Sequence, residues 1–207
     1  MHVEILCAQP AHVLEDFGSA VVDLGAKLAL LNAPSWLHSA ERAEGGLAEA
    51  GHLLGRLYDL VDVCDMDPAT VEQIDQHAHV PVFDGLANAD HEFHLLAELM
   101  TMRELAKRPF HQLTVRIAGE AGHRLHEAAN LAARQLQMTL VREPVVADGE
   151  SSPSSFVLDA TAPIDAGRLA FEHAPAVDAG RWLNDVARNR RLLLQAAVQA
   201  VLRTPSG

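Results

Sequence analysis

The sequence predicts an all-α protein, and composition and periodicity carry that prediction. The 207 residues are 49% hydrophobic but only 4% aromatic, and alanine and leucine, which favour helices, are far commoner than runs of β-branched residues. Apolar residues recur at helical spacings of three and four in several long stretches. We therefore expect a four-helix bundle with a long crossover connection at residues 1–142, a linker at 143–164, and a C-terminal helical segment at 165–207 that packs on the bundle or on a second subunit.

The first two predicted helices cover residues 10–31 and 39–63. In the first, apolar residues recur every three or four positions from Leu14 to Leu31. The second buries a stripe that includes Leu54, and the Gly45–Gly46 pair weakens its first turns.

A long connection at residues 62–84 follows, which is the length that a crossover needs. It carries a short helix of its own, because Asp67 suits an N-cap and Pro68 suits the first helical position. The third predicted helix covers 86–108. The fourth covers 109–142 and, at about 1.5 Å per residue, is the longest element of the bundle.

After residue 142 the composition changes. Residues 147–155 are rich in Gly, Ser, Pro and acidic residues, which is typical of a flexible linker. Residues 156–158 are a candidate short strand. Asp165 suits the cap of a short helix, and residues 177–202 predict a last helix.

The net charge and the lengths of the apolar runs indicate which partners are excluded and where the protein is located. The chain has 28 acidic and 16 basic residues, a net charge of -12, so we expect no nucleic-acid partner and no membrane partner. No apolar run reaches membrane-spanning length and the start lacks a signal peptide, which predicts a cytoplasmic protein. Cys7 and Cys64 are interpreted as two small buried apolar residues rather than a disulfide.

The candidate site rests on a repeated Glu-Ala-Gly-His motif in a chain that has 12 histidines. The motif places Glu49 with His52 on the second helix, and Glu120 with His123 on the fourth. Residues three apart lie on one face of a helix, so a carboxylate and an imidazole can bind the same metal ion. Such ligands suit iron or manganese.

These motifs resemble those of the ferritin-like di-metal carboxylate proteins, whose four helices carry Glu, Glu-x-x-His, Glu and Glu-x-x-His around one crossover. The resemblance covers about residues 10–142. It implies two metal ions, iron or manganese, and an oxidase or oxygenase activity or iron handling. The metal ligands that it implies are Glu15, Glu49, His52, Glu92, Glu120 and His123.

The third helix offers a second constellation. Asp90, His94 and Glu98 lie four residues apart on one face and could hold one ion. The run around them also resembles the Asp-x-x-x-His segment of the helical ligand-binding domain of GntR-type regulators. That resemblance implies a metal that orients a small carboxylate ligand.

Helical phase supports a different function. Glu120 and His123 align with Arg116 and Glu127, whereas the apolar stripe of the same predicted helix runs through Ala121. This pattern is typical of a solvated polar face. The alternative prediction is therefore a non-catalytic all-α regulatory or interaction protein, with a homodimer or a helical protein as partner through the C-terminal helix.

Overall fold

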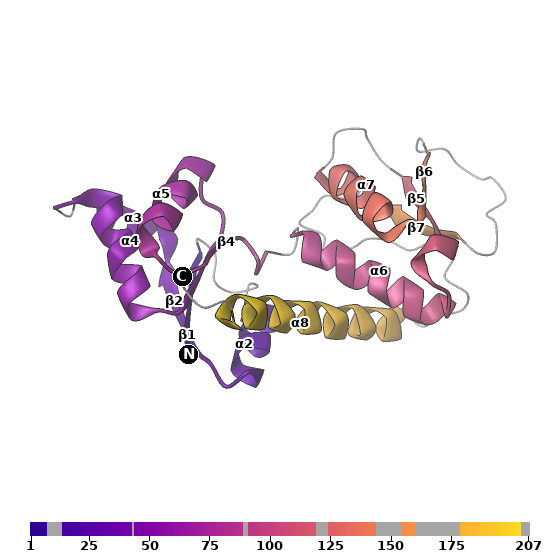
Figure 1. The fold of residues 1–207 in the computed structure, drawn as a ribbon, viewed down its shortest axis with the longest axis horizontal. Coiled ribbons are helices and arrows are strands. Elements are labelled where there is room, and N and C mark those ends of the chain that lie inside the picture. Colours follow the sequence, from indigo (N-terminus) through magenta and orange to yellow (C-terminus); the bar gives the residue numbers. More distant parts are fainter. Residues whose placement is uncertain are drawn as a thin grey trace. The chain divides into compact units, whose positions relative to one another are not determined.

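The chain has an α/β fold, so the prediction of an all-α four-helix bundle is wrong. The computed structural model describes residues 1–7, 14–42, 44–88, 91–118, 124–143, 155–159 and 179–203. Within these ranges, strands of two parallel sheets alternate with helices along the chain (Figure 1). The chain divides into two compact units. Unit 1 comprises Met1–His91 and Arg191–Gly207, and unit 2 comprises Glu92–Arg190.

Unit 1 is built on a four-stranded sheet, here called sheet A. Its strands are β1 (His2–Cys7), β2 (Lys27–Asn32), β3 (Leu60–Val63) and β4 (Val82–Asp84). Their order in the sheet is β2-β1-β3-β4, and every neighbouring pair is parallel. All four strands therefore end at one edge, and the chain changes direction across the sheet between β1 and β3.

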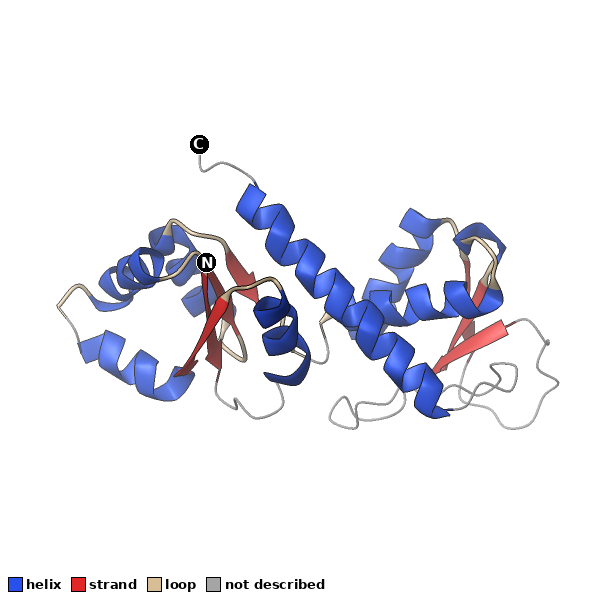
Figure 2. Ribbon diagram, turned by 90° about the horizontal axis from the view of Figure 1, so that it is seen from below, coloured by secondary structure: helices blue, strands red, loops and turns tan. Residues whose placement is uncertain are grey.

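Short helical segments connect these strands, as parallel pairing requires. A helical turn, η1 (Leu14–Gly18), and α2 (Ser19–Asp23) join β1 to β2. The segments α3 (Ala33–Arg42) and α4 (Gly46–Leu57) join β2 to β3, and α5 (Pro68–Ala78) joins β3 to β4. Figure 2 shows sheet A with helices on both sides.

One core cluster lies between sheet A and its connecting helices. Leu6, Val61 and Val63 of the sheet are fully buried and pack with Leu54 of α4 and Ile74 of α5. The burial of nearly every residue of β1 and β3 is typical of parallel sheets that are covered on both faces.

Two glycines allow α4 and α5 to approach closely. A Cβ atom added to Gly55 would lie 1.6 Å from the carbonyl oxygen of Ala78, and one added to Gly51 would lie 3.0 Å from Cβ of His77. Only glycine at position 55 permits this packing, because the contact is with backbone that is fixed within α5.

Unit 2 is built on a three-stranded sheet, here called sheet B. Its strands are β5 (Thr114–Ala118), β6 (Thr139–Glu143) and β7 (Ser155–Asp159), in the order β6-β5-β7 with both pairs parallel. Before β5 come α6 (Glu92–Ala106) and a short 3-10 turn, η2 (Phe110–Gln112), while α7 (Arg124–Leu136) joins β5 to β6.

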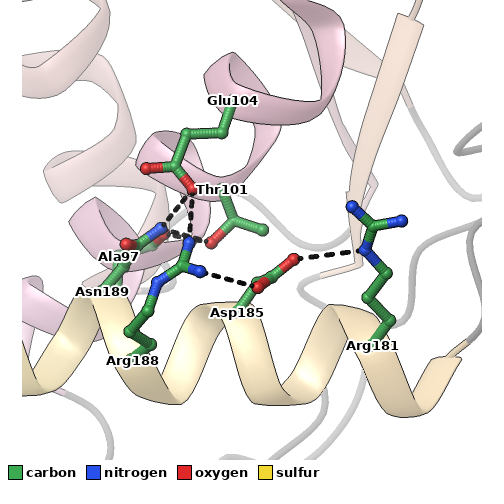
Figure 3. A network of polar contacts seen from close by, with 7 residues as sticks. All are labelled: Ala97, Thr101, Glu104, Arg181, Asp185, Arg188 and Asn189. Atoms are coloured by element: carbon green, nitrogen blue, oxygen red, sulfur yellow. Dashed lines mark hydrogen bonds and ion pairs between the residues drawn. The ribbon is translucent and has the colours of Figure 1, made fainter.

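The last helix, α8 (Ala179–Arg203), contributes its first half to unit 2 and its second half to unit 1. In unit 2 it docks on α6 through polar contacts (Figure 3). Buried Asn189 donates its amide to Thr101 Oγ1 at 2.9 Å, and Arg188 donates to Glu104 at 2.8 Å. In unit 1, Arg191 forms an ion pair with Asp23 of α2.

The bundle prediction fails because short buried strands and helices share an apolar pattern. The predicted helix at 10–31 contains β2 except for its last residue, the helix at 39–63 contains β3, and the helix at 109–142 contains β5 and most of β6. Periodicity alone does not separate a buried strand of four to six residues from part of a helix. The leucines of β2 favour a helix in isolation. They form a strand here because β2 pairs with β1, and that pairing outweighs the local preference.

Other elements are confirmed. The short helix after Asp67 is α5, where the Asp67 side chain accepts from the backbone N–H of Thr70 at 3.0 Å and Pro68 takes the first position. The last predicted helix, 177–202, corresponds to α8, and the candidate strand at 156–158 lies within β7. The predicted linker at 143–164 falls largely outside the described residues.

Candidate functional site

The carboxyl edge of sheet A is the candidate site. Cys7, Asn32, Val63 and Asp84 are the last residues of its four strands. In open parallel sheets, ligands bind outside this edge, at the point where the strand order reverses. In sheet A that point lies between β1 and β3.

Asp62 of β3 organises the loop beside this point. Its side chain is fully buried. Oδ1 accepts a hydrogen bond from the backbone N–H of Leu86 at 2.8 Å, and Oδ2 accepts one from that of Ala87 at 2.9 Å. Asp62 therefore holds the segment after β4 against the end of the sheet, and satisfies two buried N–H groups that no regular ladder satisfies.

Burial raises the pKa of Asp62 from 3.8 to about 6, although the N–H groups of Ala87 and Leu86 oppose the shift. The negative charge of Asp84 adds to the rise. The carboxylate is thus ionised at pH 7 but gains its proton on mild acidification. A buried carboxylate with a raised pKa at a strand end is typical of functional sites.

Two thiols lie beside Asp62. Cys64 directs its Sγ at Asp62 Oδ2, 3.6 Å away, and Cys7 directs its Sγ at Asp65 Oδ2, 4.0 Å away. Burial raises the pKa of the Cys64 thiol, and the charge of Asp62 raises it further. Cys64 is therefore a neutral thiol at pH 7, and the expectation that both cysteines are buried is confirmed.

Asp65 completes this edge after β3. Its backbone has φ of 58°, in the left-handed region, and its Oδ1 lies 3.5 Å from Nδ2 of Asn88. Asn88 belongs to the same loop that Asp62 holds. Both carboxylates therefore contact the segment that follows β4, so a ligand at this edge would lie against that segment.

A second buried carboxyl group lies within β1. Glu4 is fully buried, and burial raises its pKa from 4.5 to about 7. Burial and the neighbouring Glu4 raise the pKa of Tyr58 to about 12. Near neutral pH, Glu4 is therefore close to half protonated, while Tyr58 keeps its proton.

The predicted ligands on α4 are placed as follows. Glu49 is exposed, and His52 is half-buried. The His52 ring lies 5.3 Å from that of His77 and 5.4 Å from that of His79, measured between ring centroids. His52 thus packs in an imidazole cluster with two histidines of the α5 end, which the motif analysis did not select.

Several predicted ligands fall outside what the structure describes. Glu120, His123 and Asp90 lie outside the described residues, and Glu15 lies in η1 with its side chain outside the description. Glu92 begins α6 and is exposed. Among the residues that are described, no group of three or more His, Cys, Asp or Glu side chains could hold a metal ion.

The second constellation is found in part. His94 Nε2 lies 3.5 Å from Glu98 Oε1 on α6, as their spacing predicts. Burial raises the pKa of Glu98, and the neighbouring His94 opposes that rise. This pair is a polar contact within the buried face of α6 in unit 2.

The sequence analysis missed Asp62 and Asp65 as site residues. The available signal was the short apolar run of β3, Leu-Val-Asp-Val, which contains one carboxylate and is followed at once by Cys64 and Asp65. Interpreted as a strand, this run would have placed polar groups at a strand end. The sequence analysis instead placed Asp62 where a predicted helix ends and a connection begins, which gave it no role at a strand end.

The chain is similar in sequence to carbamoyltransferases. The chain is 31% identical over 122 residues to an ornithine carbamoyltransferase of Cutibacterium acnes, an alignment that covers 59% of this chain and 36% of that protein. It is 30% identical over 122 residues to a catabolic ornithine carbamoyltransferase of Burkholderia mallei, covering 59% and 35%. The chain thus matches about a third of the length of these relatives. No family model matches it.

Solved structures agree on the fold. An ornithine carbamoyltransferase from Thermus thermophilus superposes with a TM-score of 0.70 at 17% identity, covering 98% of this chain and 86% of that one. An aspartate transcarbamoylase from Trypanosoma cruzi, in complex with carbamoyl aspartate and phosphate, gives 0.60 at 12% identity, covering 94% and 82%. The chain therefore has the fold of these carbamoyltransferases.

These findings overturn the metal hypothesis. The resemblance to ferritin-like proteins is wrong, because the similar proteins are α/β carbamoyltransferases. The predicted metal-binding oxidase or oxygenase is wrong for the same reason. So is the iron or manganese cofactor, for which the described residues offer no ligand group. The alternative of an all-α interaction protein falls with the all-α fold.

Proposed function

We propose that this chain acts in carbamoyl transfer, with a small amino acid as the acceptor. The observation that carries the proposal is the 31% identity over 122 residues to an ornithine carbamoyltransferase. The fold, with two parallel sheets, also supports it, because it is the fold of an ornithine carbamoyltransferase. The expected cytoplasmic location belongs to this proposal. Of the helices that the structure describes, none is long and apolar enough to cross a membrane.

The chemistry follows from the ligands of one structural neighbour. Carbamoyl aspartate and phosphate, held by the Trypanosoma cruzi protein, are the products of moving a carbamoyl group from phosphate to an amine. The amine nitrogen attacks the carbamoyl carbon, the bond from that carbon to the phosphate oxygen breaks, phosphate leaves, and the nitrogen loses a proton. A protein that performs this step must hold an amine and a phosphate side by side.

The described edge of sheet A suits the amine better than the phosphate. Asp65 and Asp84 place negative charge there, which attracts a cationic amino group. The described residues of the strand ends, 7, 32–35, 64–67, 84–88 and 91, contain neither lysine nor arginine. Phosphate sites depend on cationic side chains or on helix N-termini. The described edge offers the N-termini of α3 and α5, so a phosphate bound there would still take its cationic side chains from other parts of the protein.

The test is an assay of ureido product from the full chain with carbamoyl phosphate and either ornithine or aspartate. We expect product with one acceptor, and we expect Asp62→Asn to reduce its formation, because the loop at residues 86–87 loses its anchor. Asp75→Asn, at an exposed position of α5, is the matched control. Absence of product with both acceptors would overturn carbamoyl transfer by this chain.

A second candidate follows from the lack of cations at the described edge. It is the binding of an amino acid, or of its carbamoylated form, without turnover. Calorimetric titration with ornithine and with citrulline tests it. Binding without product formation would support this candidate, and absence of binding to either compound would contradict it.

A further inference from the structure

Cys7 and Cys64 are the chain's two cysteines, and sheet A brings them together. Leu6 of β1 pairs with Val63 of β3, so Cys7 and Cys64 form the next pair along the same two strands. The ladder continues there, because the backbone N–H of Cys64 donates to the carbonyl oxygen of Leu6 at 2.8 Å. Paired residues on neighbouring parallel strands direct their side chains to the same face.

The spacing of neighbouring strands matches that of a disulfide. Strands in a sheet lie about 4.7–4.9 Å apart, and disulfides join residues whose Cα atoms are about 4.4–6.8 Å apart. The two thiols also contact each other: after burial and the charge of Asp62, the neighbouring Cys7 is a further cause of the raised pKa of Cys64. The register of β1 and β3 therefore brings Cys7 and Cys64 to the separation that a disulfide spans.

We propose that Cys7 and Cys64 form an intramolecular disulfide by exchange with a small-molecule disulfide, which makes the ends of β1 and β3 a redox-sensitive site. In the first step the thiolate of one cysteine attacks the small disulfide, forms a mixed disulfide with it and displaces one thiolate. In the second step the other cysteine loses its proton and attacks the cysteine sulfur of the mixed disulfide. The bond between the two cysteines forms, and the small molecule leaves as the second thiolate. The protein loses two electrons and two protons, and the small disulfide becomes two thiols.

Burial determines the rate of this exchange. Cys7 is 1% exposed and Cys64 is fully buried, so a small disulfide reaches them only when the ends of the strands open locally. The high pKa of Cys64 slows its attack further. The exchange is therefore slow in the folded protein and faster in mild urea, and the product is protected once it has formed.

The disulfide also changes the anchor of the adjacent loop. In the reduced protein the Cys64 thiol is directed at Asp62 Oδ2, the oxygen that also accepts from the N–H of Ala87. Oxidation removes the thiol hydrogen, so Asp62 loses one of the groups that stabilise its charge. The amides of Leu86 and Ala87 therefore report the redox state of the pair.

The test uses the full chain, equilibrated in oxidised glutathione until the mass no longer changes, then unfolded and alkylated. We expect intact mass to fall by about 2 Da, the two lost hydrogens, with neither cysteine alkylated. Hydrogen exchange at Leu86 and Ala87 should differ between the reduced and the oxidised protein. Cys7→Ser and Cys64→Ser should each keep one glutathione or one alkylated thiol, and neither should show the mass loss.

Two outcomes would overturn the proposal. One is alkylation of both cysteines after equilibration, which shows that the pair does not oxidise. The other is a stable mixed disulfide in the unaltered protein, which shows that the second thiol does not reach the first. Neither outcome depends on carbamoyl transfer, so this proposal and the proposed function fail separately.

Discussion

The two units bury polar side chains in different places. In the described part of unit 1, the fully buried carboxyl groups, Glu4 and Asp62, lie within strands of sheet A. In unit 2 the buried polar residues that the structure describes, among them Glu98, Thr101 and Asn189, lie on helices. A polar group on a helix face can pair with a neighbouring helix. The burial of a carboxyl group inside a sheet costs free energy unless other groups satisfy its oxygens.

This difference separates packing from function. Thr101 and Asn189 bond to each other across α6 and α8, so they specify how two helices dock (Figure 3). Asp62 instead bonds to a loop that leaves the sheet at its carboxyl edge. Asp62 is buried, has a raised pKa and does not join two helices. A role in a functional site therefore explains it better than a role in stability.

The largest expected effect tests the packing that supports the site. Gly55→Ala should lower the free energy of unfolding by about 3 kcal/mol, because its Cβ would overlap the backbone of Ala78 and separate α4 from α5. Gly51→Ala adds the same methyl group on the same helix at 3.0 Å from His77, and should cost about 1 kcal/mol or less. Urea unfolding measures both. Equal effects would show that the close contact does not limit the packing.

The same packing shows what the sequence could and could not predict. Elements with local signals were predictable: α5 from Asp67 and Pro68, and α8 from its long amphipathic pattern. The strands were not predictable, because β2 is short and rich in leucine and β3 is short and buried on both faces. Both form strands because they pair with β1. A helix cap lies within a few residues of its partner, whereas strand pairing joins residues that are far apart in the chain.

The site was less predictable than the fold. Asp62 takes its role from Leu86 and Ala87, which lie 24 and 25 residues later. Cys7 and Cys64 meet only through the register of β1 and β3. The repeated Glu-Ala-Gly-His motif, by contrast, contains His52, whose ring contacts those of His77 and His79. No residue spacing within one helix predicts this contact.

The next effect tests the anchor of the loop. Asp62→Asn should lower the free energy of unfolding by about 2 kcal/mol, because the amide group cannot accept both N–H groups and leaves one unsatisfied. Hydrogen exchange at Leu86 and Ala87 should rise. Asp75→Asn, which changes an exposed carboxylate, should leave both quantities unaltered. If exchange at these two amides does not change, Asp62 does not hold the loop.

The pH dependence of stability tests the buried carboxyl groups. The pKa of Glu4 is raised in the folded protein from 4.5 to about 7, so the folded state binds this proton more tightly than the unfolded state. Its contribution to stability is therefore greatest below pH 4.5 and falls as the pH rises through 7. Glu4→Gln should stabilise the protein at pH 8 by about 1–2 kcal/mol and remove this dependence.

Matched variants sharpen that comparison between the units. Glu41→Gln, at an exposed position, should leave the pH dependence unaltered. Glu98→Gln in unit 2 should also weaken the pH dependence, because burial raises the pKa of Glu98 although the neighbouring His94 opposes that rise. Urea unfolding at pH 5 and pH 8 measures each difference. A Glu4→Gln variant that is less stable than the unaltered protein at pH 8 would contradict the sign worked out above.

The smallest effect concerns the ion pairs of α8. Arg188 bonds to Glu104 at 2.8 Å and to Asp185 at 3.1 Å, but its side chain is 55% exposed. Exposed pairs contribute little, so Arg188→Ala should cost about 0.5 kcal/mol, and the difference should vanish in about 1 M salt, where charges are screened within about 3 Å. Arg181→Ala, whose pair with Asp185 spans 3.7 Å, is the control and should cost less. A loss above about 2 kcal/mol for Arg188→Ala, unaffected by salt, would mean that charge rather than the buried Asn189–Thr101 bond holds α8 on α6.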